Sequence, residues 1–137
     1  MTPEALADLC TRAYQHMSPW TAAQIASTLA QPSSLLTTSQ RAFVLGQVIT
    51  DEAEILALAA DPAKQRSGQA SAALEMFHRQ ARTRGAARVF LEVPEHNIPA
   101  IRFYEKHGYT AVGRRKAYYR LTNGPSADAL IMARDLP

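Results

Sequence analysis

The sequence predicts an α/β fold. Two amphipathic helical segments open the chain, three short apolar segments with strand character follow, and helical and strand-like segments then alternate towards the C-terminus. The chain has 137 residues and contains no segment that reads as a linker. We therefore expect one domain over residues 1–137, built around one core.

The first half of the chain is expected to supply two helices and three antiparallel strands. Apolar residues with helical spacing predict a first helix over residues 3–17. Thr21 and Gln24 form a capping-box pattern, which predicts the start of a second helix that reaches Leu29. Apolar segments bounded by polar turns then predict three strands, over residues 35–36, 43–49 and 55–60.

In the second half, helices and strands alternate. A helix over residues 70–84 is expected to bury an apolar face and to place His78 on its polar face. The strand that follows alternates, so that Val89, Leu91 and Val93 point one way and Glu92 points the other. The last elements are expected to be a helix over residues 97–107 and two strands, over 116–121 and 129–134.

Composition narrows the class of protein. Hydrophobic residues make up 47% and charged residues 20% of the chain, which is typical of a globular protein and excludes a disordered or collagen-like one. Cys10 is the only cysteine, so we expect it in the core of a cytoplasmic protein without disulfides. No apolar segment is long enough to span a membrane, and a net charge of +3 favours an anionic ligand or partner.

A short segment between a predicted strand and a predicted helix has the character of an anion site. Backbone N–H groups and the positive end of the helix face the same point there. Gly68 lets the backbone approach a phosphate closely, Ala70 is small, and Arg66 adds positive charge. This pattern is weak by itself, because many strand-to-helix turns contain one glycine and bind nothing.

Two stretches taken together are more specific. The pattern Gln65-x-x-Gly68-x-Ala70, after the strand and turn at residues 58–62, resembles the coenzyme A loop of the GNAT N-acetyltransferase superfamily. Residues 91–109 then repeat the second conserved block of that superfamily in the same order and spacing. The resemblance runs over residues 55–132, and it identifies the chain as similar to acetyl-CoA-dependent N-acetyltransferases.

The resemblance implies the GNAT fold, a mixed twisted sheet flanked by helices, with acetyl-CoA as cosubstrate. The chain departs from the usual pattern at Gln69 and Ala70, where an apolar residue and a second glycine are common. The first helix also begins as early as Pro3, so we expect the strand that usually opens the fold to be missing. The cofactor-binding residues that the resemblance implies are Leu58, Ala59, Ala60, Gln65, Arg66, Ser67, Gly68, Gln69, Ala70, Ser71 and Asn97.

Glu92 is the first candidate catalytic residue. A carboxylate on an otherwise apolar strand is costly to bury and needs a reason. The α-amine of a protein has a pKa of roughly 8, so most of it is protonated at neutral pH and cannot attack a thioester. The resemblance implies that Glu92 accepts this proton, through water, as the general base. The alternative is a glutamate that simply faces solvent.

Tyr104 is the second candidate, and the resemblance makes it the general acid that protonates the leaving thiolate. Phenols have a pKa of about 10 and thiols of about 8.5, so this transfer is uphill and needs help from the surroundings. The alternative is a core aromatic residue on an amphipathic helix. Asn97 is expected either to bond the pantetheine arm or to hold the strand-to-helix turn.

Further residues concern the acceptor. Residues 18–20, 115–119 and 128–132 are similar to those of the bacterial ribosomal-protein alanine N-acetyltransferases, the RimI type. This implies the N-terminal alanine of a small-subunit ribosomal protein as acceptor, with Trp20, Tyr118 and Tyr119 on the acceptor side. Alternatives are a GNAT enzyme for a small-molecule amine and a non-catalytic sensor of coenzyme A.

Other partners are not expected. The four histidines, His16, His78, His96 and His107, lack metal-ligand spacing, so no metal is predicted. The arginines of residues 79–88 read as a solvated helix face rather than a nucleic-acid site. We expect no membrane binding, and a monomer or weak dimer.

Overall fold

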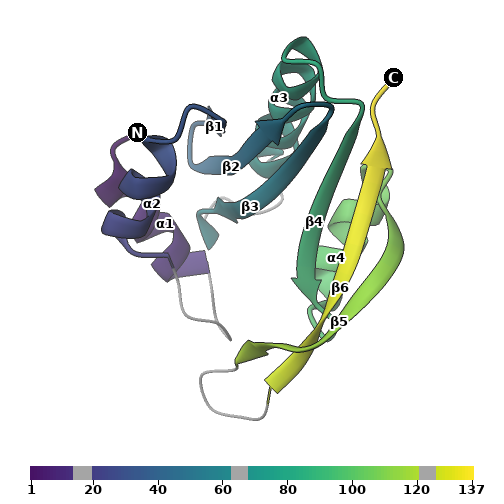
Figure 1. Cartoon of the computed structure of the whole chain (residues 1–137). Coiled ribbons are helices and arrows are strands. Elements are labelled where there is room, and N and C mark those ends of the chain that lie inside the picture. Colours follow the sequence, from purple (N-terminus) through teal and green to yellow (C-terminus); the bar gives the residue numbers. More distant parts are fainter. Residues whose placement is uncertain (14–19, 63–67, 121–125) are drawn as a thin grey trace.

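The computed structural model describes residues 1–13, 20–62, 68–120 and 126–137, and of residues 117–120, 126 and 127 it describes only the backbone. Four helices and six strands follow one another in this part of the chain (Figure 1). They are α1 (Pro3–Ala13), α2 (Ala22–Leu29), β1 (Ser34–Ser39), β2 (Ala42–Ile49), β3 (Glu52–Ala60), α3 (Gln69–Thr83), β4 (Arg88–Pro94), α4 (Ile98–Lys106), β5 (Thr110–Arg120) and β6 (Ser126–Asp135).

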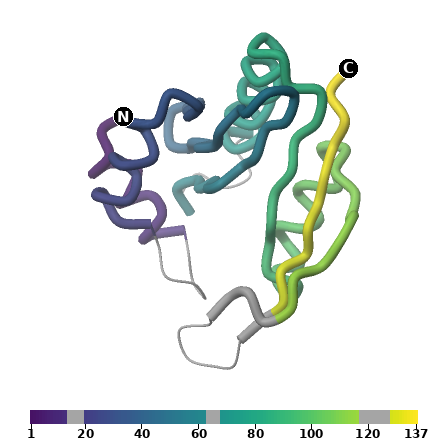
Figure 2. The backbone as a smooth tube through the Cα atoms, viewed as in Figure 1, coloured from purple at the N-terminus to yellow at the C-terminus, as the bar shows by residue number. Residues whose placement is uncertain are grey.

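All six strands belong to one sheet, in the order β1-β2-β3-β4-β6-β5. Every neighbouring pair is antiparallel except β3 and β4, which are parallel and are joined through α3. The backbone trace shows β1, β2 and β3 as one arm of the sheet and β4, β5 and β6 as the other (Figure 2). The mixed sheet and the three consecutive antiparallel strands are therefore confirmed, and within residues 1–13 no strand precedes α1.

Several element boundaries follow from local sequence, as expected. The capping box of α2 is complete, because the Thr21 hydroxyl accepts from the Gln24 amide at 3.1 Å and the Gln24 side chain accepts from the Thr21 amide at 2.9 Å. The described part of α1 ends at Ala13, so its predicted continuation to Met17 lies outside the described residues.

The last two strands are longer than predicted. β5 begins at Thr110 and β6 at Ser126, and the two pair with each other from Thr110 opposite Ala133 to Arg120 opposite Ser126, with two irregularities. Polar residues such as Arg114 give no apolar alternation, so pairing between strands, and not strand propensity, decides these boundaries.

Two apolar clusters cover the two faces of the sheet. One lies beneath α3 and α4 and includes Leu74, Phe77, Leu91 and Met132. The other lies beneath α1 and α2, and it contains Cys10, which is fully buried as expected. We call the face of the sheet that carries α1 and α2 the outer face, and the face that carries α3 and α4 the inner face. The main strand contacts of α1 and α2 are with β3 and β1, so in the described part of the chain the outer face of β4, β6 and β5 carries no helix (Figure 1).

The prediction for His78 was wrong. This side chain is 5% exposed and lies in a polar cluster beneath α3, because the residues that follow α4 pack against this side of the helix. Arg134 can only donate, so Nδ1 of His78 accepts from Arg134 Nη1 at 3.1 Å, and Nε2 donates to the Tyr109 hydroxyl at 2.7 Å. Burial, reinforced by the charge of Arg134, lowers the pKa of His78 to about 4.

This histidine should make stability depend on pH. As pH falls from about 6.5 towards about 4, the unfolded chain binds a proton at His78 and the folded chain does not, so the free energy of unfolding should fall. Above about pH 6.5 both states are neutral at this residue and the contribution is fully present. His78→Gln should show a flatter dependence in urea unfolding across this window; equal slopes in the two proteins would contradict the assignment.

Candidate active site

The parallel strands at the centre of the sheet separate. β3 and β4 pair from Glu52 opposite Arg88 to Ile55 opposite Leu91, and the pairing stops there. Beyond this point β3 pairs only with β2, and β4 pairs only with β6, although both strands are described over their whole length. The divergence is plain in Figure 1. It leaves one backbone edge of β3 available to an extended ligand, which can bind as an added strand.

A β-bulge lies at the point of divergence. Leu45 pairs with Ala57 and Gly46 pairs with Ile55, so Leu56 is the extra residue of β3. The bulge reverses the alternation of the strand: Ile55 belongs to the cluster beneath α3 and α4, whereas Ala57 belongs to the cluster beneath α1 and α2.

The bulge also decides where the predicted pantetheine-binding residues lie. Leu58 and Ala60 are partly buried against the α3 and α4 cluster, and Ala59 is buried on the opposite side. Their side chains therefore pack against the two apolar clusters. Only their backbone is left to contact a ligand at this edge.

The start of α3 has the geometry that the predicted anion site requires. Gly68 caps the helix with a left-handed φ of 83°, and a Cβ placed on it would meet no atom of the described residues within 4 Å. Neighbouring side chains have protein partners: the Ser39 hydroxyl donates to Gln69 at 2.7 Å, and Ser71 lies 3.0 Å from His107 Nε2.

The first-turn amides of α3, which include that of Ala70, have no partner within the helix. These amides and the open space at Gly68 fit an anionic group such as a pyrophosphate. The predicted cofactor residues Gln65, Arg66 and Ser67 lie outside the described residues.

Glu92 lies on the outer face of β4, opposite to Val89, Leu91 and Val93, as the alternation predicted. Its side chain is 25% exposed and forms an ion pair with Arg115 of β5, with 3.1 Å between Oε1 and Nη2. The carboxylate is thus neither fully solvated nor buried without a partner.

Tyr104 lies on the inner side of the sheet, on α4. It is 8% exposed and packs edge-on against Tyr109, with ring centroids 5.6 Å apart. Burial raises its pKa, so the phenol stays protonated and able to donate throughout the neutral range. Asn97 caps α4 by accepting from the Ala100 amide at 3.3 Å, which is the turn-holding role among its two predicted roles.

Of the predicted acceptor residues, the structure describes the side chain of Trp20 alone. Trp20 is half-buried against the cluster beneath α1 and α2. Tyr118 and Tyr119 lie on β5, and their side chains lie outside the described atoms.

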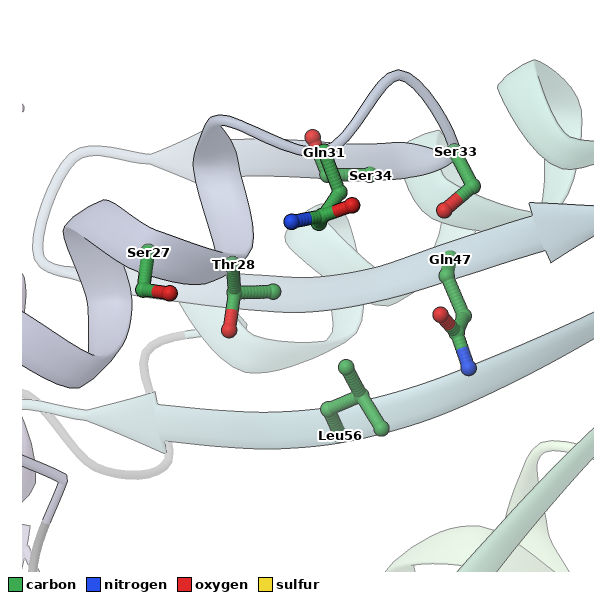
Figure 3. A pocket seen from close by; sticks show the side chains of 7 residues that line it. All are labelled: Ser27, Thr28, Gln31, Ser33, Ser34, Gln47 and Leu56. Carbon is green, nitrogen blue, oxygen red and sulfur yellow. The ribbon is translucent and has the colours of Figure 1, made fainter.

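Two hollows on the outer face contain none of the predicted residues. One, of about 180 Å³, lies where the end of α2 meets the sheet, with Gln47 and Leu56 at its base (Figure 3). The second, of about 240 Å³, shares Gln47 and reaches Glu54 and Phe90. Together they extend from α2 across β2 and β3 to β4, the strand that carries Glu92.

Sequence reasoning missed Glu54 and Arg115. Glu54 could have been found from the sequence, because a carboxylate between Ala53 and Ile55 in a strand is as costly to bury as that of Glu92. Arg115 was recognised only as part of the tail pattern, because its pairing with Glu92 depends on how β5 aligns with β6.

Residues 1–13, 20–62, 68–120 and 126–137 contain no group of three or more His, Cys, Asp or Glu side chains that could hold a metal ion. In the same ranges, no helix has the length and apolar character needed to cross a membrane.

Known proteins are similar to this chain in sequence and in fold. The acetyltransferase (GNAT) family profile matches residues 11–109. The [ribosomal protein bS18]-alanine N-acetyltransferase of Escherichia coli (strain K12) is 36% identical over 122 residues, which cover 86% of this chain and 82% of that protein. The enzyme of the same name from Haemophilus ducreyi is 37% identical over 92 residues, 67% of this chain and 63% of that protein.

Solved structures agree. The crystal structure of the ribosomal-protein-S18-alanine N-acetyltransferase from Escherichia coli superposes with a TM-score of 0.86 at 33% identity, covering 98% of this chain and 87% of that one. Ard1 from Thermoplasma volcanium superposes with a TM-score of 0.82 at 28% identity, covering 100% and 95% of the two chains.

The bulge makes Gly46 a sensitive position. A Cβ on Gly46 would lie 2.2 Å from the Glu54 carbonyl oxygen and 2.6 Å from the Phe77 ring, so Gly46→Ala should lower the free energy of unfolding by about 1–3 kcal/mol. Gly113→Ala is the matched control, because there the nearest atom is the end of the Ile131 side chain at 3.4 Å. Urea unfolding measures both variants, and equal stabilities would show that the close approach at the bulge is not limiting.

Proposed function

The chain belongs to the acetyltransferase (GNAT) family of acetyl-CoA-dependent N-acetyltransferases, and we propose that it acetylates the N-terminal alanine of a small-subunit ribosomal protein. One observation carries the proposal: an enzyme named for that reaction is 36% identical over 86% of this chain. A ribosomal acceptor implies a cytoplasmic enzyme, and we expect the reaction to need no metal.

Acetyl-CoA supplies an acetyl group activated as a thioester. The described residues fit such a ligand at two places, the open backbone edge of β3 after Ile55 and the amides at the start of α3 beside Gly68. The predicted residues Gln65, Arg66 and Ser67 would complete the second place. Asn97, besides capping α4, has an exposed side chain whose NH₂ group can donate to the pantetheine arm.

We propose Glu92 as the general base. Its carboxylate lies on the side of the sheet that no described helix covers, close to the divergence of β3 and β4, so both an amine and water can approach it. Accepting the proton of an ammonium group leaves a neutral amine, which can attack a carbonyl carbon. The hollows beside Gln47 and Glu54 lie on the same face and offer the acceptor chain a surface.

We propose Tyr104 as the general acid. Its burial keeps the hydroxyl protonated, which a donor requires, although it also makes the phenol a weaker acid than one in water. Protonation of a leaving thiolate therefore depends on charge that develops during the reaction. Glu92 and Tyr104 lie on opposite faces of the sheet, so the proposed mechanism requires the reacting groups to meet at the divergence of β3 and β4.

The acceptor can be tested directly. A peptide that begins with alanine and follows the N-terminal sequence of protein bS18 should be acetylated far faster than free polyamines or internal lysines, since the acceptor surface selects a chain end. Transfer of label from acetyl-CoA measures all three, and the same peptide with a blocked N-terminus is the control. Equal rates on polyamines would sink this proposal and favour an enzyme for small amines.

Gly68 should be needed for acetyl-CoA binding. A ligand that binds only the folded state raises its melting temperature, and Gly68→Val should abolish that shift by filling the open space beside the first turn of α3. Gly85→Val is the matched control: Gly85 also has a left-handed φ, of 100°, but lies after the other end of α3. Thermal melting should show the shift retained in that variant; a retained shift in Gly68→Val would remove this loop from the site.

Tyr104→Phe separates acid catalysis from packing, because it removes a hydroxyl and keeps the ring. Turnover should fall by about two to four orders of magnitude, with the melting temperature close to that of the wild type. Tyr109→Phe is the control, since its hydroxyl bonds to His78 and serves stability. Turnover rates and melting temperatures are measured for both variants. Wild-type turnover in Tyr104→Phe would show that Tyr104 serves only to pack the core.

A further inference from the structure

Three charged side chains meet on the uncovered face of the sheet. Glu92 of β4 pairs with Arg115 of β5, 3.1 Å apart, and Glu54 of β3 interacts electrostatically with both. The pair is partly exposed, at 25% for Glu92 and 53% for Arg115. Pairs of this kind contribute little to stability, so its arrangement calls for another explanation.

Strand register brings these residues together. Glu92 stands opposite Ile131 of β6, which stands opposite Gly113 of β5; Arg115, two residues further along, points to the same face. On the neighbouring strand β3, Glu54 pairs with Phe90 of β4. Phe90 lies two residues before Glu92, so Glu54 and Glu92 point to the same face of the sheet. The contact therefore spans four strands and is set by the sheet.

The pKa of Glu54 responds to both of the other charged groups. Desolvation is the main cause that raises its pKa, although much of the side chain is exposed, and the charge of Glu92 raises it further. Arg115 acts in the opposite direction and lowers it. Two carboxylates thus stand beside a single guanidinium. Without that cation, the repulsion between the two like charges would be unopposed by Arg115.

Other charged groups lie on the same side of the sheet, and among them Glu52 of β3 stands beside Arg88. Among the described residues, Arg88 of β4 pairs with Asp135 and stacks on Phe90, with 4.8 Å to the ring centroid. Arg12 of α1 pairs with Asp8 and Asp61.

We propose that Arg115 is a positioning residue that holds the Glu92 carboxylate in an ion pair and offsets the negative charge of the neighbouring Glu54. This rests on the proposed function, in which Glu92 accepts the proton of the acceptor amine. A cation held against a carboxylate favours the charged form of that carboxylate, so the loss of Arg115 is expected to appear in the pH dependence of the reaction. Glu54 adds negative charge to the face that an ammonium group must approach.

The test is the dependence of kcat/KM on pH. In Arg115→Gln the acid limb should move up by about one pH unit, so that activity falls about tenfold below the limb and recovers above it. Arg115→Lys keeps the charge and should leave the limb near its wild-type position. Glu54→Gln should move the limb down, and the double variant Arg115→Gln, Glu54→Gln should bring it back towards the wild type.

The neighbouring arginine is a matched control. Arg114 points to the opposite face, where it pairs with Glu95 and, at 3.5 Å, with Asp128. Arg114→Gln should leave the acid limb unmoved. A melting temperature within the wild-type range for each variant establishes that it folds; were Arg115→Gln not to fold, Arg115→Lys and Glu54→Gln would still carry the test.

Glu92→Gln separates the two proposals. If the acid limb vanishes in Glu92→Gln but stays at its wild-type position in Arg115→Gln, the base is correctly assigned and the role of Arg115 is wrong. A uniform loss of activity at every pH in Arg115→Gln would also overturn that role. An acid limb that persists in Glu92→Gln would instead contradict the proposed base.

Discussion

The parallel pairing of β3 with β4 stops at Ile55 and Leu91, and the geometry of the site depends on that. The extra residue at Leu56 breaks the register with β2 at the same level, where Gly46 allows the Glu54 carbonyl and the Phe77 ring to approach. A continuous parallel pairing would satisfy the backbone of both strands and leave no edge for a ligand. The bulge also turns the side chains of residues 57–60 into the two clusters, so that backbone alone faces the divergence.

The two faces of the sheet give the two candidate catalytic groups different surroundings. Tyr104 lies on the face of α4 that packs against the sheet, where burial favours its neutral form. Glu92 lies where no described helix covers the sheet, partly exposed to solvent and paired with Arg115. The proposed base and the proposed acid therefore lie in different environments, one on each face of the sheet.

A buried polar cluster holds α4 against the sheet. Arg134 of β6 donates to the His107 carbonyl at 2.8 Å and to His78, and His78 in turn donates to Tyr109. Tyr109 packs against Tyr104, so the position of the proposed acid depends on this cluster. Neutral His78 is part of the arrangement, because Arg134 requires an acceptor at Nδ1.

Local sequence by itself determined the order of the elements, the capping box of α2, the cap at Asn97 and the face of β4 that carries Glu92, because each depends on residues within a few positions of one another. Tertiary structure decided the burial of His78, the bulge at Leu56 and the pairing of Arg115 with Glu92. Each of these depends on which strand or helix lies alongside, and no spacing within a single segment encodes that neighbour.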